Sequence, residues 1–227
     1  GKHGIYYHRF PKDKVSLLKN QLGQIDPTIG IKVFPNQSSP KDLADLLSLH
    51  FIAPEINKIG IKAPYTTQPL SLVNFIHHRY TQPRHFEGVH LSEYKFPYKK
   101  VVNHTCFSLN NKLKQIGISW TDCWERNILF PKITLDALQK SWNKQLEKND
   151  GNEQDALRFW GIDDDTNLDL SDQAIIVDMG WMKCDSGSNA GKNILEYKNK
   201  LFNFMEEKKM SNYYKEYFEA AFNEVLS

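Results

Sequence analysis

At 227 residues the chain is long enough for one domain, or for two small lobes around a cleft, with an adequate core. Its 29 basic and 27 acidic side chains are mixed along the sequence, and a formal net charge of +2 does not favour a nucleic-acid partner. No apolar run approaches the roughly 20 residues that span a bilayer, so we expect a soluble chain without a membrane span, cytoplasmic or secreted without a recognisable signal.

The first part of the chain alternates between strand-like and helical patterns. Residues 5–7 are strand-like, residues 15–22 place apolar side chains on one helical face, and residues 29–34 (IGIKVF) are a β-branched apolar run. A strand, a short helix and a second strand are therefore expected. The second strand carries one charge, Lys32, within an otherwise apolar pattern.

A longer helix is expected next. Ser39 is a suitable N-cap, and Pro40 is a residue that the first helical turn tolerates. The apolar spacing that follows predicts a helix over residues 40–51, ended by Pro54. Beyond it the pattern is more β-like, and residues 89–94 (VHLSEY) are the last expected strand of a β-rich N-terminal half.

The second half of the chain is more helical. Apolar residues recur at helical steps over residues 102–116, and Gly117 provides a C-terminal stop. A short strand over 128–130, an amphipathic helix capped by Thr134, a polar turn-rich segment and a buried strand over 174–177 are expected to follow. Two further helical patterns occupy the C-terminal segment.

Two short segments carry the candidate chemistry. Residues 116–130 read IGISWTDCWERNILF, with Asp122 five positions before Asn127 and a strand directly after it. Residues 173–181 read QAIIVDMGW, a strand that ends in an Asp-Met-Gly turn at 178–180. Their order resembles the catalytic core of the protein-kinase-like family, in which a catalytic aspartate follows a long helix, an asparagine comes five positions later, and a later strand ends in an Asp-x-Gly turn.

This resemblance implies an ATP- and Mg²⁺-dependent phosphotransferase. Transfer of a γ-phosphoryl group needs positioning and charge neutralisation, for which oxygen-bearing side chains hold Mg²⁺ against the phosphates. Asn127 and Asp178 are the implied nucleotide and metal ligands. Asp122 is the implied catalytic carboxylate, which orients the incoming hydroxyl and accepts its proton. Gly180 is expected to permit the sharp backbone turn that aims Asp178.

The resemblance also extends upstream. The run IGIKVF resembles the family's Val-Ala-Ile-Lys strand, which makes Lys32 the implied contact of the α- and β-phosphates. The helix over 40–51 has the position of the helix that supplies this lysine with a glutamate partner, but it contains no glutamate. Asp45 on the helix and Glu55 just beyond it are the nearest acidic alternatives.

Two positional assignments complete the implied nucleotide site. By register, residues 89–96 resemble the last N-lobe strand and the hinge, which puts Glu93 and Tyr94 beside the adenine. The opening segment, GKHGIYYHRF, is a poor match to a glycine-rich phosphate loop, and a poorly ordered terminus is the simpler interpretation.

The sequence departs from the family pattern in three places. Trp120-Thr121 stands where His-Arg usually precedes the aspartate, so no arginine is available to receive an activation-loop phosphate. An insertion over 131–172 replaces a short hairpin, and it either covers the cleft or binds a partner. No Ala-Pro-Glu motif follows Asp178, and the chain after Gly180 is too short for the helices that grip peptide substrates.

The remaining candidates favour structural interpretations. Cys106, Cys123 and Cys184 are an odd number without Cys-x-x-Cys spacing, which argues against a disulfide framework or a zinc site and favours a reducing compartment. The acidic segment over 163–169 lacks the glycine and the terminal glutamate of a Ca²⁺-binding loop at the required offsets, so a solvated loop is expected.

The predicted fold is α+β, of the protein-kinase-like two-lobe type, with a β-rich N-lobe over 1–95 and a truncated helical C-lobe over 96–227. ATP and Mg²⁺ are the expected ligands, and the acceptor is a protein or small-molecule hydroxyl. Whether a protein partner binds the insertion over 131–172 is left open. Two alternatives stand beside this interpretation. One is an inactive pseudokinase that binds a partner, and the other is nucleotidyl transfer on the same fold.

Overall fold

The computed structural model describes residues 5–9, 28–33, 39–64, 79–83 and 88–227. The strands are β1 (Ile5–Arg9), β2 (Thr28–Val33), β3 (Arg79–Pro83), β4 (Val89–His90), β5 (Ile118–Trp120), β6 (Ile128–Phe130), β7 (Ile175–Ile176) and β8 (Met182–Cys184). The α-helices are α1 (Pro40–Leu47), α2 (Ala53–Lys58), α4 (Tyr98–Gln115), α5 (Lys132–Lys148), α6 (Glu153–Phe159), α7 (Ile162–Thr166), α8 (Leu170–Gln173), α9 (Asn189–Glu207) and α10 (Asn212–Val225). Shorter helical turns are η2 (Ser48–Ile52), η3 (Leu91–Glu93) and η4 (Glu125–Asn127).

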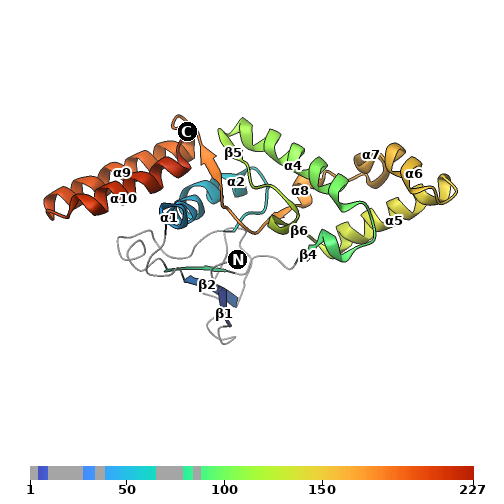
Figure 1. Ribbon diagram of the computed structural model, residues 1–227, viewed down its shortest axis with the longest axis horizontal. Helices are drawn as coiled ribbons and strands as arrows, with labels where there is room; N and C mark the ends of the chain where they lie inside the picture. The colour runs from blue at the N-terminus through green and yellow to red at the C-terminus, as the bar shows by residue number, and fades with distance from the viewer. Residues whose placement is uncertain (1–4, 10–27, 34–38, 65–78, 84–87) are drawn as a thin grey trace.

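The predicted α+β class is confirmed. The described residues form three small antiparallel sheets, β1-β2-β3, β4-β6-β7 and β5-β8, with the α9–α10 hairpin at one end of the molecule and α5 to α7 at the other (Figure 1). The strands expected near residues 5–7 and 29–34 are present as β1 and β2. The helix expected over 15–22 lies outside the described residues. Among the described helices, none is both long enough and apolar enough to cross a membrane.

The helix predicted over residues 40–51 is longer than expected. Its start is held by Ser39, whose backbone N–H donates to the Asp42 carboxylate over 2.8 Å. Helical structure then runs from α1 through the π-helical turn η2 into α2. The prediction that Pro54 ends the helix is wrong, because Pro54 falls in the first turn of α2, where its missing N–H costs no intrahelical hydrogen bond.

Helix α4 and the reversal after it match the sequence prediction. One face of the helix is buried, as its apolar spacing requires, and its members are Val101, Val102, Thr105, Leu109 and Leu113. Gly117 follows with a φ of 69°, in the left-handed region that glycine adopts without a Cβ penalty. The chain therefore turns back after α4 and enters β5.

For the elements after β6, some sequence predictions are wrong and others are confirmed. Thr134 is not the cap of α5, because the helix begins after Pro131 and Thr134 lies inside its first turn. The polar segment expected to be turn-rich contains α6, α7 and α8. The two C-terminal helical patterns are confirmed as α9 and α10, which form an antiparallel hairpin beside α1 (Figure 1).

The N-terminal and C-terminal halves of the chain contribute strands to the same sheet. The last strand expected in the N-terminal half is shorter than predicted, and it pairs with β6 of the C-terminal half through Val89 and Phe130. Helix α1 packs against α10. The division into lobes at residue 95 stays a prediction.

Candidate functional site

Two strand pairings bring the candidate segments together. Strand β5 pairs with β8 through Trp120 and Met182, and β6 pairs with β7 through Ile128 and Ile176. The loop between β5 and β6 must therefore face the turn between β7 and β8. As a result, segments separated by about fifty residues of sequence lie side by side.

Asn127 connects the two segments. Its side chain is 6% exposed, and its Nδ2 donates to both the carbonyl oxygen and the Oδ2 of Asp122, over 2.9 and 2.8 Å. Its own carbonyl oxygen accepts a hydrogen bond from the backbone N–H of Val177, directly before Asp178, over 3.1 Å. Because Nδ2 is used by Asp122, Oδ1 is the amide atom available to a cation.

Asp122 and Asp178 line the same pocket. The pocket has a volume of about 190 Å³, and its wall also contains Gly180, Trp181 and Asp45 of α1. Of the two acidic alternatives proposed on sequence, Asp45 is therefore the one at the pocket. Glu55 instead forms an ion pair with Lys58 over 2.6 Å.

The pocket is rich in oxygen donors. Three further residues with charged side chains line it: Lys41 and Asp42 from α1 and Glu224 from α10. Within the described part of the chain, no group of three or more His, Cys, Asp and Glu side chains is arranged to hold a metal ion alone. Mg²⁺ commonly takes only one or two protein carboxylates and completes its shell with water and substrate phosphates, so the donor set fits this ion.

The turn at Asp178 differs from the sequence prediction in one respect. Asp178 Oδ1 accepts a hydrogen bond from the Gly180 N–H over 3.0 Å, which closes the turn. The left-handed residue is Trp181, with a φ of 62°, and not Gly180. Gly180 is useful because of its size, since an added Cβ would lie 3.3 Å from Asp178 Oδ1.

Trp181 is held by both neighbouring segments. Its carbonyl oxygen accepts hydrogen bonds from the Thr121 N–H and hydroxyl, over 3.5 and 3.4 Å. The residue is 54% exposed, and the Lys41 ammonium lies 3.6 Å from the ring centroid. A non-glycine residue in the left-handed region is costly unless its surroundings fix it, and such residues cluster at functional sites. The sequence feature that indicates this part of the pocket wall is the tryptophan directly after the Asp-x-Gly turn.

Trp120 anchors the same turn, and its replacement gives a test. Its indole Nε1 donates to the Gly180 carbonyl oxygen over 3.2 Å. We expect Trp120→Phe to lower the free energy of unfolding by about 1–2 kcal/mol, because a partly buried carbonyl loses its donor. Urea unfolding measures this change. The control is Trp124→Phe, at a 42% exposed ring, which should change stability by less than about 0.5 kcal/mol. Equal effects of the two substitutions would contradict the anchoring role.

Asn127 is not part of the pocket wall and reaches it through its hydrogen bond to Asp122, and neither Glu93 nor Tyr94 lines the pocket. The backbone of Lys32 lies in β2, opposite Tyr80 of β3, but its side chain is outside the described residues. Glu93 is exposed at the end of η3. The Tyr94 hydroxyl donates to the Asp136 carboxylate over 2.8 Å, which raises the pKa of Tyr94. Contacts of these three residues with a nucleotide stay predictions.

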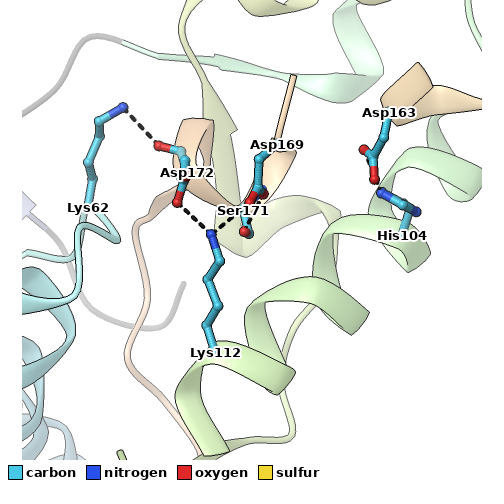
Figure 2. A network of polar contacts seen from close by, with 7 residues as sticks. All are labelled: Lys62, His104, Lys112, Asp163, Asp169, Ser171 and Asp172. Carbon is cyan, nitrogen blue, oxygen red and sulfur yellow. Dashed lines mark hydrogen bonds and ion pairs between the residues drawn. The ribbon is translucent and has the colours of Figure 1, made fainter. Parts of the chain in front are cut away.

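The insertion packs on α4, and none of its described residues lines the pocket. Figure 2 shows the polar network that fastens it: Lys112 of α4 pairs with Asp169 over 2.8 Å and with Asp172 over 2.6 Å, and His104 contacts Asp163 over 2.8 Å. The acidic segment was expected to be a solvated loop, but residues 162–166 form α7, and Asp163 and Asp169 pair with side chains of α4. Both roles left open for the insertion, covering the cleft and binding a partner, stay predictions.

This network predicts a pH-dependent contribution to stability. Partial burial acts in the opposite direction, but hydrogen bonds from Lys112 and Ser171 lower the pKa of Asp169 from 3.8 to about 2. The folded state therefore holds Asp169 ionised, so the stabilisation is complete above about pH 4 and is lost as the pH falls toward 2. Because Asp169 is half exposed, we expect Asp169→Asn to cost only about 1 kcal/mol at pH 6, and less at pH 3. Urea unfolding at both pH values checks this, and an equal cost at both would contradict it.

The cysteines correct a sequence expectation. Cys106 of α4 and Cys123, directly after Asp122, form a disulfide with a Cα–Cα distance of 5.7 Å, whereas Cys184 is a buried free thiol. The odd count had argued against disulfides, but it cannot exclude one pair with one cysteine left over. Disulfides persist in oxidising compartments, so the cysteines no longer support a reducing one.

Comparison with models of protein families and with curated proteins found no match for this chain. Its function is therefore inferred from the site itself, from the order of its motifs along the sequence and from the chemistry of the side chains at the pocket.

Proposed function

We propose that this chain is an ATP- and Mg²⁺-dependent phosphotransferase with a reduced protein-kinase-like two-lobe fold, which transfers the γ-phosphoryl group to a hydroxyl acceptor. One observation carries the proposal. Asp122 and Asp178 line one pocket, while Asn127 hydrogen-bonds Asp122 and the backbone beside Asp178. These are the three residues that the resemblance assigns to the reaction.

The oxygen atoms suit two different tasks. Asp178 and the Oδ1 of Asn127 are the groups that would hold Mg²⁺, and the ion would supply neutralisation of the phosphate charge. Asp122 Oδ2 is taken by Asn127 Nδ2, so Oδ1 is the atom that accepts a hydrogen bond from the acceptor hydroxyl. From that position Asp122 orients the hydroxyl and takes its proton late in the transfer.

The charges at the pocket favour a strict metal requirement. The wall carries the carboxylates of Asp42, Asp45, Asp122, Asp178 and Glu224, against the ammonium of Lys41. Such a wall repels the phosphates of free ATP by Coulomb's law, and a divalent cation between them reverses the sign of the interaction. ATP binding should therefore require Mg²⁺.

The test follows the label from two forms of ATP. Purified chain is incubated with γ-labelled or α-labelled ATP, with and without Mg²⁺, in the presence of a peptide mixture and a set of small alcohols. The proposal expects Mg²⁺-dependent transfer of the γ label only. Transfer of the α label would replace it by nucleotidyl transfer, and ATP binding without any transfer would replace it by the pseudokinase interpretation.

A further inference from the structure

The Cys106–Cys123 disulfide lies one residue from Asp122. Chain geometry explains the pairing. From Cys106 to the end of α4 the helix advances about 14 Å, at 1.5 Å per residue. After Gly117 the chain returns along the helix, and an extended segment from residue 118 to 123 covers about 16 Å at 3.3 Å per residue. The return therefore brings Cys123 level with Cys106.

Helix α4 is a firm support for this bond. Its apolar face is buried, and its polar side chains bind two neighbouring elements. Lys112 pairs with Asp169 and Asp172, and the Lys100 ammonium donates to the carbonyl oxygens of Leu157 and Trp160 over 2.6 and 2.7 Å. The disulfide therefore joins the loop over residues 121–124 to a helix whose own position is fixed by packing and ion pairs.

The loop that carries Asp122 has few other restraints. Residues 121–124 lie between β5 and η4 and form no regular helix or strand. Thr121 contacts the Trp181 carbonyl oxygen at one end, and Asn127 contacts Asp122 from the other. Each is a noncovalent contact worth about 1 kcal/mol. The disulfide is the covalent restraint on the position of Asp122.

We propose that the Cys106–Cys123 disulfide positions Asp122, so that phosphoryl transfer depends on the thiol redox state of the chain. The inference rests on the phosphotransferase proposed above. Cys123 and Cys106 are positioning residues, because neither lines the pocket and both act through Asp122.

The redox step is a thiol–disulfide exchange with a dithiol reductant. A thiolate of the reductant attacks one sulfur and breaks the S–S bond, which gives a mixed disulfide, and its second thiol then resolves this intermediate. The products are two cysteine thiols and the oxidised reductant, with two electrons and two protons transferred. Cys106 Sγ lies 3.0 Å from the Cys123 carbonyl oxygen, so the reduced thiol can still donate a hydrogen bond to the loop. Reduction should therefore loosen the loop without releasing it.

The test measures kcat and the KM for ATP in oxidised and dithiothreitol-treated protein, with thiols counted by alkylation and mass spectrometry. We expect reduction to lower kcat by about 10-fold to 100-fold, since displacements near 1 Å cost that much in catalysis. The KM for ATP should stay within about twofold, because the nucleotide is held by Asp178 and Asn127. Reoxidation should restore kcat.

Two variants act as controls. Cys184→Ala should keep the full redox response, because burial raises the pKa of Cys184 to about 11 and keeps this thiol unreactive. The double variant Cys106→Ser/Cys123→Ser should show the reduced kcat under all conditions while it still binds ATP with Mg²⁺. That binding shows that the double variant is folded.

A second readout needs no activity. Arg126 is exposed, three residues after Cys123, and trypsin can cut after it only when the loop opens. Reduction should raise the rate of this cleavage, even if the oxidised chain transfers no phosphate and the proposed function fails. Free thiols at both positions in air-oxidised protein would overturn the inference, and so would a reduction that changes neither kcat nor cleavage at Arg126.

Discussion

Asp178→Ala should remove Mg²⁺-dependent ATP binding, with a loss of affinity of at least about 100-fold, or 2.7 kcal/mol. Asp178 lines the pocket and is the carboxylate assigned to the metal. Without Asp178, Mg²⁺ loses one of its protein ligands. The remaining carboxylates of the pocket then repel the ATP phosphates with less compensation by the metal ion. Equilibrium binding of ATP with and without Mg²⁺ measures the effect.

A second variant separates the metal role of Asp178 from its structural role. Asp178→Asn keeps an oxygen that can accept the Gly180 N–H, so the turn is preserved while the charge is lost. We expect it to bind ATP nearly as poorly as Asp178→Ala. The matched control is Asp164→Asn, at an exposed carboxylate on α7 outside this pocket, which should bind ATP normally. Affinity within twofold of the wild type for Asp178→Asn would rule out the metal role.

Asp122→Asn should separate binding from chemistry. The substituted amide keeps an oxygen that can accept the hydrogen bond from Asn127 Nδ2, so the loop geometry is expected to persist. It cannot accept the proton of the acceptor hydroxyl. We expect kcat for γ-phosphoryl transfer to fall by about 10² to 10⁴, the usual contribution of a positioned general base, while ATP affinity stays within about threefold.

The ratio of the two effects decides this second prediction. Single-turnover transfer and equilibrium ATP binding are measured on the same preparation, with Asp164→Asn as the control for removal of an exposed carboxylate. An unchanged transfer rate in Asp122→Asn would show that Asp122 is not the catalytic carboxylate. An equal loss of transfer and of ATP affinity would assign Asp122 to nucleotide binding instead.

Elements with long, regular apolar spacing could be predicted from the sequence. Helix α4 repeats its buried positions over 18 residues. Gly117 after it adopts a positive φ, which permits the compact chain reversal that follows the helix. Strand β6 was also predicted at its observed bounds. The pattern is strong in these places because burial of one face decides both the sequence and the structure.

Elements that depend on tertiary context were missed. Strand β8 reads Met-Lys-Cys, and its central lysine interrupts the kind of apolar run that indicates the equally short β6. A local pattern predicts a helix stop at Pro54, because nothing near it in sequence shows that a new helical segment starts one residue before it. The disulfide between Cys106 and Cys123 depends on how far the chain returns along α4, which spacing rules for cysteines do not contain.

The candidate site divides in the same way. The order of Asp122, Asn127 and Asp178 could be read from the sequence, because each belongs to a short motif beside a strand. The contributions of Lys41 and Glu224 could not, because they depend on how α1 and α10 pack around the pocket. Helix packing is set by side chains far apart in sequence, which a local pattern does not reveal.

We propose that Asp122, Asn127 and Asp178 meet at one metal ion and one nucleotide, and iron-directed cleavage can locate that ion. Fe²⁺ replaces Mg²⁺, ascorbate and peroxide generate hydroxyl radicals at the bound ion, and mass spectrometry locates the breaks in the chain. We expect ATP-dependent cleavage in both segments, near residues 122–127 and near 178–181, and its loss in Asp178→Ala. Cleavage at only one of the two segments, or at neither, would contradict it.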